Sequence, residues 1–375
     1  MKFSDIPGLS EVKELLCATV TRRQVPHAQL FFGKAGSATL PLALAFARYL
    51  HCTNRSQTDS CGVCPSCHKY NKWIHPDLHF IFPTATNKKF TKSTEAISQN
   101  FLQDWRVFLK EQPWAALPDW SNFIGTENKQ CLISKEESRN IIRSLSLKAF
   151  EGEYKIMMIW LPELMHPSAA NAILKILEEP PAGTIFLLVS HSSEKLLTTI
   201  LSRTQLRQIR QFTDHEIAGY LQQTFRLDSE KAAYLAYLAE GDLGAAIRQV
   251  GEVSHEAPRF FQEWMRVCFR SDFTSMLGFA ETFQKLPKEE QKAVLQYGLG
   301  ILRESLLIKY AGRQLLRLQQ DELKFVGNFS KVLDEATIDL LSGYFTESIA
   351  FIERNANAKI LFASLSVKLS KQFKK

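Results

Sequence analysis

The sequence predicts an α/β domain followed by an all-α region, and two observations support this fold class. Up to about residue 210, short apolar runs of strand length alternate with segments of helical periodicity, as in a parallel sheet with crossover helices. Beyond Thr213 the strand-like runs stop, and apolar residues recur at helical spacing to the end of the chain. The 375 residues provide for roughly two to three domains.

The elements of the first part are placed by their apolar runs and end signals. The last helix of this part should stop before Pro180, because proline lacks a backbone donor and disfavours a helical residue before it. Ser134 and Glu137 have the spacing of a capping box, which predicts that a helix begins at Ser134. Strands are expected at residues 28–32, 78–82, 156–161, 185–190 and 205–209, and further helices at 9–20, 41–50 and 168–179.

Residues 84–130 interrupt this alternation. The stretch is polar and is interrupted by Pro113 and Pro118, yet it also contains three tryptophans, Trp105, Trp114 and Trp120. Because large aromatic side chains are seldom left in water, we interpret it as an insertion that packs against another surface, which the sequence does not identify. Three short helices are then expected over 213–250, with Gly241 and Gly244 between the last two, and long amphipathic helices over 256–375.

The composition is that of a folded, non-membrane chain. Hydrophobic residues make up 45% and charged residues 23%, which is typical of a globular protein. No apolar run reaches the roughly 18 residues that a membrane helix needs, and the N-terminal stretch lacks the apolar core of a secretory signal. We therefore expect a soluble, cytoplasmic protein. The net charge of +7 is compatible with a nucleic-acid partner but does not require one.

Four of the seven cysteines are grouped within a short stretch, Cys52, Cys61, Cys64 and Cys67. Two residues between thiolates allow one tight turn to offer both sulfurs to a single ion about 2.3 Å away, and Cys52 can complete a tetrahedron. Four thiolates leave no open position, so we predict one structural Zn²⁺. An iron–sulfur cluster uses similar spacings and remains the alternative.

The loop after the first expected strand resembles a phosphate-binding loop from which the functional residues are missing. Of G-x-x-x-x-G-K-[ST], the glycine at Gly33 matches, and Gly36 adds a second glycine inside the loop. Ala38 replaces the second glycine of the motif, Thr39 the lysine that reaches the phosphates, and Leu40 the hydroxyl that binds Mg²⁺. Nucleotide binding is therefore not indicated by this loop alone.

The second half of such a site is also incomplete. A buried strand should end in acids that hold Mg²⁺, but here the run continues into Trp160 and Leu161, and a single carboxylate, Glu163, follows. Two separate parts of the phosphate machinery are missing, which argues against ATP hydrolysis by this chain.

These features occur together with longer motifs that carry a family resemblance. The sequence P-H-A at 26–28 precedes the first strand, A-A-N-A-I-L-K-I-L-E-E-P-P covers 169–181, and E-K-L-L at 194–197 is followed by Ser202 and Arg203. In order and spacing they resemble the bacterial clamp-loader subunits of DNA polymerase III, specifically those of delta prime type. The resemblance covers residues 1 to about 250 well, and the C-terminal helices only loosely, through E-R-N-A-N at 353–357.

The resemblance implies a domain organisation and a task. It implies an AAA+ domain over 1–212 with a zinc module at 52–67 and the insertion at 84–130, a small helical lid over 213–252, and a helical collar over 253–375 that holds a ring together. It implies a subunit of the DNA polymerase holoenzyme that helps load the sliding clamp on primed DNA, beside gamma/tau and delta subunits. Such a subunit has a degenerate ATP site and binds DNA through the complex.

The resemblance also implies a trans-acting role for Arg203, preceded by Ser202, at the ATP site of a neighbouring subunit. Two departures from the family pattern accompany it: Thr204 replaces the cysteine of Ser-Arg-Cys, and Gly244 replaces an arginine of the hydrolysing members. A structural ion pair is the alternative role for Arg203. Likewise Asn171, Lys175 and Glu178 have an alternative explanation as surface residues of a cap-stabilised helix.

Two other functions stay open at this point. The first is an active gamma-type ATPase, which the missing lysine and acids disfavour. The second is a zinc-dependent DNA-binding regulator, which would need a basic recognition helix or an aromatic and basic platform, and no compact one stands out.

Overall fold

The computed structural model describes residues 1–126, 129–146, 148–250, 257–310, 320–354 and 356–373. The predicted boundary at 252/253 and Asn355 of the E-R-N-A-N motif lie outside these residues. The chain divides into two compact units: the first contains residues 1–216 and 241–244, and the second contains 217–240 and 245–375. The division into a lid and a collar remains a prediction. None of the helices in the described ranges is long and apolar enough to span a bilayer.

The first unit is built on a parallel sheet, as the sequence predicts. Among the described residues its strands follow the order β2-β3-β4-β1-β5, and each neighbouring pair is parallel. The strands are β1 (Ala28–Phe32), β2 (Leu78–Ile81), β3 (Lys155–Trp160), β4 (Thr184–Ser190) and β5 (Gln205–Gln208). Every residue of β3 and β4 is buried, because both strands are internal and covered on both faces. All five expected strands are confirmed, with ends shifted by at most one residue.

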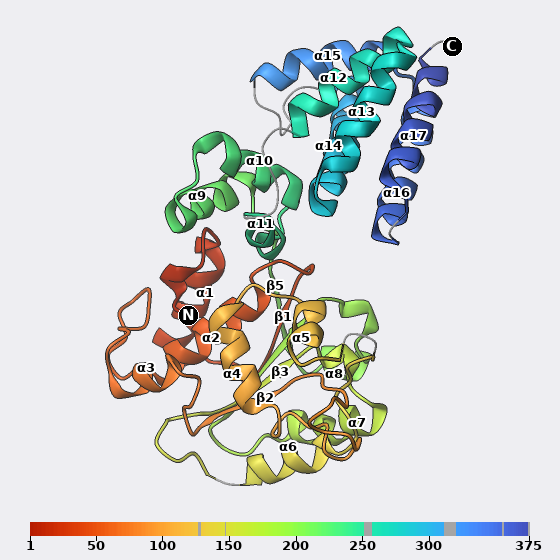
Figure 1. The fold of residues 1–375 in the computed structure, drawn as a ribbon. Helices are drawn as coiled ribbons and strands as arrows, with labels where there is room; N and C mark the ends of the chain where they lie inside the picture. Colours follow the sequence, from red (N-terminus) through yellow and green to blue (C-terminus); the bar gives the residue numbers. More distant parts are fainter. Residues whose placement is uncertain (127–128, 147, 251–256, 311–319, 355, 374–375) are drawn as a thin grey trace. The chain divides into compact units, whose positions relative to one another are not determined.

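Helices cover both faces of this sheet (Figure 1). One face carries α6 (Glu137–Ser146), α7 (Pro167–Glu178) and α8 (Thr198–Leu201), whose apolar side chains share a core with alternate residues of β1, β3 and β4. On the other side lies α2 (Thr39–His51), which is buried along its whole length. The remaining helices of the unit are α1 (Ser10–Thr21), α3 (Pro65–Tyr70), α4 (Leu102–Glu111) and α5 (Leu117–Phe123).

The insertion is part of the core of this unit. Trp105 of α4 and Trp120 of α5 are fully buried, and both pack against Phe82 just beyond β2. Trp105 also packs against Trp160 at the end of β3, with ring centroids 5.1 Å apart. The indole of Trp120 donates to the carbonyl of Pro83 at 2.8 Å. The expectation that the insertion packs against another surface is confirmed, and the structure identifies that surface as the ends of β2 and β3.

One local prediction is wrong. The helix expected to begin at Ser134 is α6, which begins at Glu137, and the hydroxyl of Ser134 makes no hydrogen bond. The carboxyl of Glu137 is buried and accepts from the backbone N–H of Ser98 in the insertion. A long-range partner therefore replaces the reciprocal bonds of a capping box.

The second unit is helical. In order, its helices are α9 (Asp214–Phe225), α10 (Ser229–Ala239), α11 (Leu243–Gln249), α12 (Ala257–Arg270), α13 (Phe273–Lys285), α14 (Lys288–Tyr310), α15 (Gln320–Val332), α16 (Glu335–Glu353) and α17 (Ala358–Gln372). The ends of α9 and α11 near residues 216 and 244 belong to the first unit. Gly244, which the sequence placed between two helices, lies inside α11.

Side-chain caps and aromatic packing explain these helices. Asp228, Asp272, Asp334 and Asn357 each cap the following helix by accepting from a backbone N–H. Such caps satisfy donors that the first turn leaves unpaired. The core contains a cluster of large rings from four helices, Phe261, Trp264, Phe283, Phe345 and Phe362.

Candidate metal and nucleotide-loop sites

The four clustered cysteines lie together between α2 and α3. Their Sγ atoms are all within 4.8 Å of one another, with Cys52 3.5 Å from Cys61 and 4.0 Å from Cys64. A tetrahedron with metal–sulfur bonds of about 2.3 Å needs sulfurs about 3.8 Å apart, whereas a disulfide needs about 2.05 Å. The donor set therefore fits one metal ion, and the Cys cluster consists of free thiols.

Backbone amides favour the thiolate form in this cluster. The N–H of Cys61 donates to Cys52 at 3.2 Å, and the N–H of Cys64 donates to Cys61 at 3.3 Å. The amides of Val63 and Cys64 lower the pKa of Cys61, while burial raises the pKa of Cys52. Four sulfurs fill a tetrahedral shell, so a bound ion would tie the loop after α2 to α3 without an open position for substrate. These residues are therefore suited to a structural metal site, not to a catalytic one.

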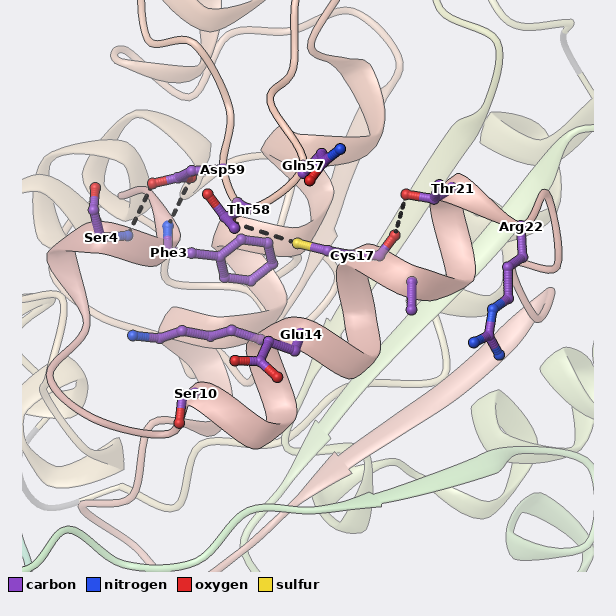
Figure 2. Close-up of a pocket in the computed structure, with 12 residues that line it drawn as sticks. Phe3, Ser4, Ser10, Glu14, Cys17, Thr21, Arg22, Gln57, Thr58 and Asp59 are labelled. Atoms are coloured by element: carbon purple, nitrogen blue, oxygen red, sulfur yellow. Dashed lines mark hydrogen bonds between the residues drawn. The ribbon is translucent and has the colours of Figure 1, made fainter.

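Hydrogen bonds attach the loop before Cys61 to the N-terminal segment. Asp59 accepts from the backbone N–H groups of Phe3 at 3.1 Å and Ser4 at 2.9 Å, and the thiol of Cys17 in α1 donates to the carbonyl of Thr58 at 3.5 Å. Figure 2 shows these contacts around a cleft of about 580 Å³ between α1 and this loop. The cysteine module is thus anchored on the α1 side as well as through α2.

The loop after β1 lies at the carboxyl end of the sheet. The N–H of Gly33 donates to the carbonyl of Ser190 at the end of β4. Gly36 has φ +83°, a left-handed conformation that glycine adopts without strain. A Cβ at Gly36 would lie 2.1 Å from Cγ of Asp242, so the carboxyl group of Asp242 packs directly against this loop. The carboxyl group of Asp242 therefore occupies the space beside Gly36 in this loop.

The positions that matter most in a phosphate-binding loop are buried. Ala38 and Thr39 are 0% exposed and Leu40 is 4% exposed, because α2 begins at Thr39 and enters the core at once. The hydroxyl of Thr39 has no hydrogen-bond partner. None of these three side chains carries a charge that could pair with phosphate.

The end of β3 holds one carboxyl group. Trp160 and Leu161 are buried, and the backbone then turns into a short 3₁₀ segment that contains Glu163. One oxygen of Glu163 accepts from the N–H of His191 at 2.9 Å, and the other has no partner. Burial raises the pKa of Glu163, which opposes the ionised form that binds Mg²⁺.

The insertion reaches Gly244, the position where hydrolysing members of the resembled family carry arginine. A Cβ at Gly244 would lie 2.3 Å from the carbonyl oxygen of Trp114. The ring of Trp114 also packs against Phe212, with centroids 5.8 Å apart. The backbone of the insertion therefore leaves room for glycine only. No local pattern could predict this contact, since the two residues are far apart along the chain.

Arg203 forms an ion pair within the chain. Its guanidinium donates to Glu178 at the end of α7, with Nε 2.7 Å from Oε1, and to the carbonyl of Thr199 at 2.9 Å. It also donates to the hydroxyl of Ser202 at 3.2 Å. Arg203 is 31% exposed and Glu178 is 49% exposed, so the pair lies at the surface. Asn171 and Lys175 of the same motif are exposed as well.

The structure thus brings some predicted site residues together and separates others. The four cysteines form one cluster, and the residues at Gly33 and Gly36 share one loop with α2. Arg203 lies elsewhere, just beyond α8, where its guanidinium donates to Glu178, Thr199 and Ser202. Asp242 was missed by sequence reasoning, because a single aspartate in a turn has no distinctive pattern.

A parallel sheet with a glycine-containing loop between its first strand and helix, followed by helical segments, defines the class: an α/β domain of the kind that carries phosphate-binding loops, with a helical region after it. The chain belongs to the family described as "DNA polymerase III, delta subunit", which matches its residues 8–213. The curated relatives that it matches include delta' and gamma/tau subunits of that polymerase.

Three comparisons illustrate the relationship. DNA polymerase III subunit delta' of Pseudomonas aeruginosa is 28% identical over 182 residues, covering 48% of this chain and 42% of that protein. The subunit delta' of Escherichia coli is 25% identical over 241 residues, covering 64% and 59%. The Bacillus subtilis DNA clamp loader delta protein has 11% identity and a TM-score of 0.37, covering 95% and 98%. The chain spans about half the length of these two curated relatives.

Proposed function

We propose that this chain is a delta prime-like subunit of a DNA polymerase III clamp loader that does not itself hydrolyse ATP. One observation carries the proposal: the position of the phosphate-binding lysine is Thr39, which is fully buried, and the carboxyl of Asp242 packs against the same loop. Phosphoryl transfer needs positive charge around the γ-phosphate, supplied by lysine, Mg²⁺ and arginine together. A buried hydroxyl and a nearby carboxylate supply the opposite environment.

A role in an assembly follows from this proposal. A chain that carries an AAA+ type domain but no working site of its own would contribute to a ring through its surfaces. We propose gamma/tau- and delta-type subunits as its partners, and the sliding clamp and primed DNA as what the complete complex acts on. The names of the relatives support this proposal, since they include both delta' and gamma/tau subunits.

We further propose that Arg203 acts on the ATP site of a neighbouring subunit. Guanidinium is always charged, planar and able to donate two bonds to phosphate oxygens. Arg203 lies at the surface and is held by an exposed carboxylate, Glu178, which phosphate oxygens could replace without breaking the core. Its partner within the chain would then serve to orient it before assembly.

The Cys cluster is proposed to hold one Zn²⁺. Zinc accepts four thiolates in a closed tetrahedron, and the sulfurs of Cys52–Cys61, Cys61–Cys67 and Cys52–Cys64 lie 3.5 to 4.0 Å apart, with all four within 4.8 Å of one another. Its role would be to fix the segment between α2 and α3, as in other structural sites.

The test uses purified chain and a complex reconstituted with its gamma- and delta-type partners. The chain alone should show no ATP turnover above background and only weak binding to primed DNA, whereas the complex should load the clamp only when the chain is present. Turnover by the isolated chain at the rate of a gamma-type subunit would contradict the proposal. Tight DNA binding by the chain alone, without any assembly, would instead favour a DNA-binding regulator.

A further inference from the structure

The second unit contains a groove with exposed apolar side chains, which we call the α12/α15 groove. It has a volume of about 710 Å³ and is lined by residues of α12 and α15. Its floor includes Met265 and Phe329, which are buried. Its rims carry Phe269, 52% exposed, and Val332, 48% exposed. An apolar surface of this kind in water is stabilised when a partner covers it.

The apolar wall of the groove is already formed. The rings of Phe325 and Phe329 stack with centroids 5.4 Å apart, one helical turn from each other on α15. Phe373 lies beside both sides of the groove, 6.0 Å from Phe329 and 6.1 Å from Phe269. A partner would therefore meet a surface that needs little rearrangement, which lowers the entropic cost of binding.

The charged side chains that line the groove are all basic. Arg266 and Arg270 lie one turn apart on α12, and Lys324 lies on α15. All three are exposed, and among the described residues none of them forms an ion pair. Arg270 lowers the pKa of Asp272 only as a minor contribution, after the hydrogen bonds from Ser275. No acidic side chain of the described residues lines the groove.

We propose that the α12/α15 groove binds an amphipathic helix of a partner protein, with large apolar residues on one face and acidic residues beside them. A groove between two helices with an apolar floor accepts a third helix through residues spaced three and four apart. The described part of α15 is 13 residues long. At about 1.5 Å per residue the groove wall therefore extends about 20 Å, the length of three to four helical turns.

A nucleic acid fits the groove less well. Base recognition on a single strand uses open aromatic faces and a continuous track of cations. Here the phenyl rings pack against one another, and the aliphatic side chains of Met265 and Val332 share the surface. An apolar floor with three cations beside it instead matches an acidic amphipathic helix, whose apolar residues would contact the floor and whose acidic residues would pair with the cations.

The test measures binding of fluorescent synthetic peptides to the full chain by anisotropy. The acidic probe has leucine or phenylalanine at every third or fourth position and glutamate between them, and its controls are a lysine-for-glutamate version and a scrambled version. The acidic probe should bind at least about tenfold more tightly than either control, a difference that two or three favourable charge pairs can supply. Raising the salt concentration should weaken it.

Variants of the chain decide where the peptide binds. Phe269→Ala and the double change Arg266→Glu with Arg270→Glu should each weaken binding about tenfold. Arg303→Glu, an exposed arginine of α14 outside the groove, should change nothing. Failure of the acidic probe to bind, or equal binding of the lysine version, overturns the proposal. Two other results would also overturn it. If oligo-dT binds in a way that depends on the arginines but not on Phe269, the groove binds nucleic acid. If the wild-type chain self-associates and the arginine variant does not, the groove binds a second copy of the chain.

Discussion

The contrast between Arg203→Ala and Glu178→Gln separates a trans-acting arginine from a structural one. The two residues form a surface ion pair, with 31% and 49% of the side chains exposed. Pairs of this kind contribute about 0.2–1 kcal/mol, so either substitution should lower the free energy of unfolding by less than about 1 kcal/mol. The two variants should therefore have similar free energies of unfolding.

Their effects on the assembled complex should differ widely. If Arg203 stabilises the transition state at a neighbour's site, Arg203→Ala should slow hydrolysis at that one site by up to roughly 10³-fold, in line with arginine-finger magnitudes. Glu178→Gln keeps the guanidinium and removes only its competing carboxylate, so hydrolysis should stay the same or rise. Arg203→Lys keeps the charge but loses the planar fork, and should recover only part of the rate.

The assay is single-turnover ATP hydrolysis by the reconstituted complex, with sizing to show that each variant assembles. A complex that assembles with Arg203→Ala and hydrolyses ATP as the wild type does would refute the trans-acting role. Equal losses from Arg203→Ala and Glu178→Gln would show that the ion pair itself supports the surface, which is the structural alternative.

Three further outcomes are expected. Cys64→Ser should reduce bound zinc from about one ion per chain to near none in elemental analysis, whereas the same change at a cysteine outside the cluster should leave it bound. Hydrogen bonds from Arg210 lower the pKa of Glu216 to about 2. The stabilisation that they provide is therefore present above pH 4.5 and is lost as the pH falls toward 2. In urea unfolding, Glu216→Gln should lower the free energy of unfolding by about 1–2 kcal/mol at pH 7 and should have no effect at pH 2. Gly244→Ala should destabilise by about 1–3 kcal/mol, because its Cβ meets a backbone carbonyl, while Gly219→Ala in the open should be neutral or stabilising in thermal unfolding.

The sheet was predictable because its signals are local. Runs such as that of β4 are apolar throughout, and a strand buried on both faces requires this pattern whatever surrounds it. The cysteine cluster was predictable for the same reason, since one short segment supplies every ligand. Residues 52, 61, 64 and 67 need only the turn between α2 and α3 to meet.

Capping boxes show where local reasoning stops. The capping box predicted from Ser134 to Glu137 does not form, because the Glu137 carboxyl accepts instead from the buried backbone N–H of Ser98 in the insertion. The same spacing from Thr213 to Glu216 does form both bonds: the N–H of Glu216 donates to the Thr213 hydroxyl, and the N–H of Thr213 donates to the Glu216 carboxyl. Only the tertiary surroundings distinguish the two, so no reading of four residues could have separated them.

Tertiary surroundings also decide what the loop after β1 can bind. A phosphate-binding loop that had merely lost its lysine would regain a cation through one substitution at Thr39. Here three separate elements act against phosphate: α2 buries Thr39, the turn before α11 places Asp242 against Gly36, and the insertion places the Trp114 carbonyl against Gly244. Thr39→Lys would bring a cation to a position that α2 buries, while Asp242 would still lie against the loop and the arginine position would stay closed by backbone. Restoring catalysis would require changes in all three elements at once, which favours a subunit that acts through its neighbours over an ATPase that has lost one residue.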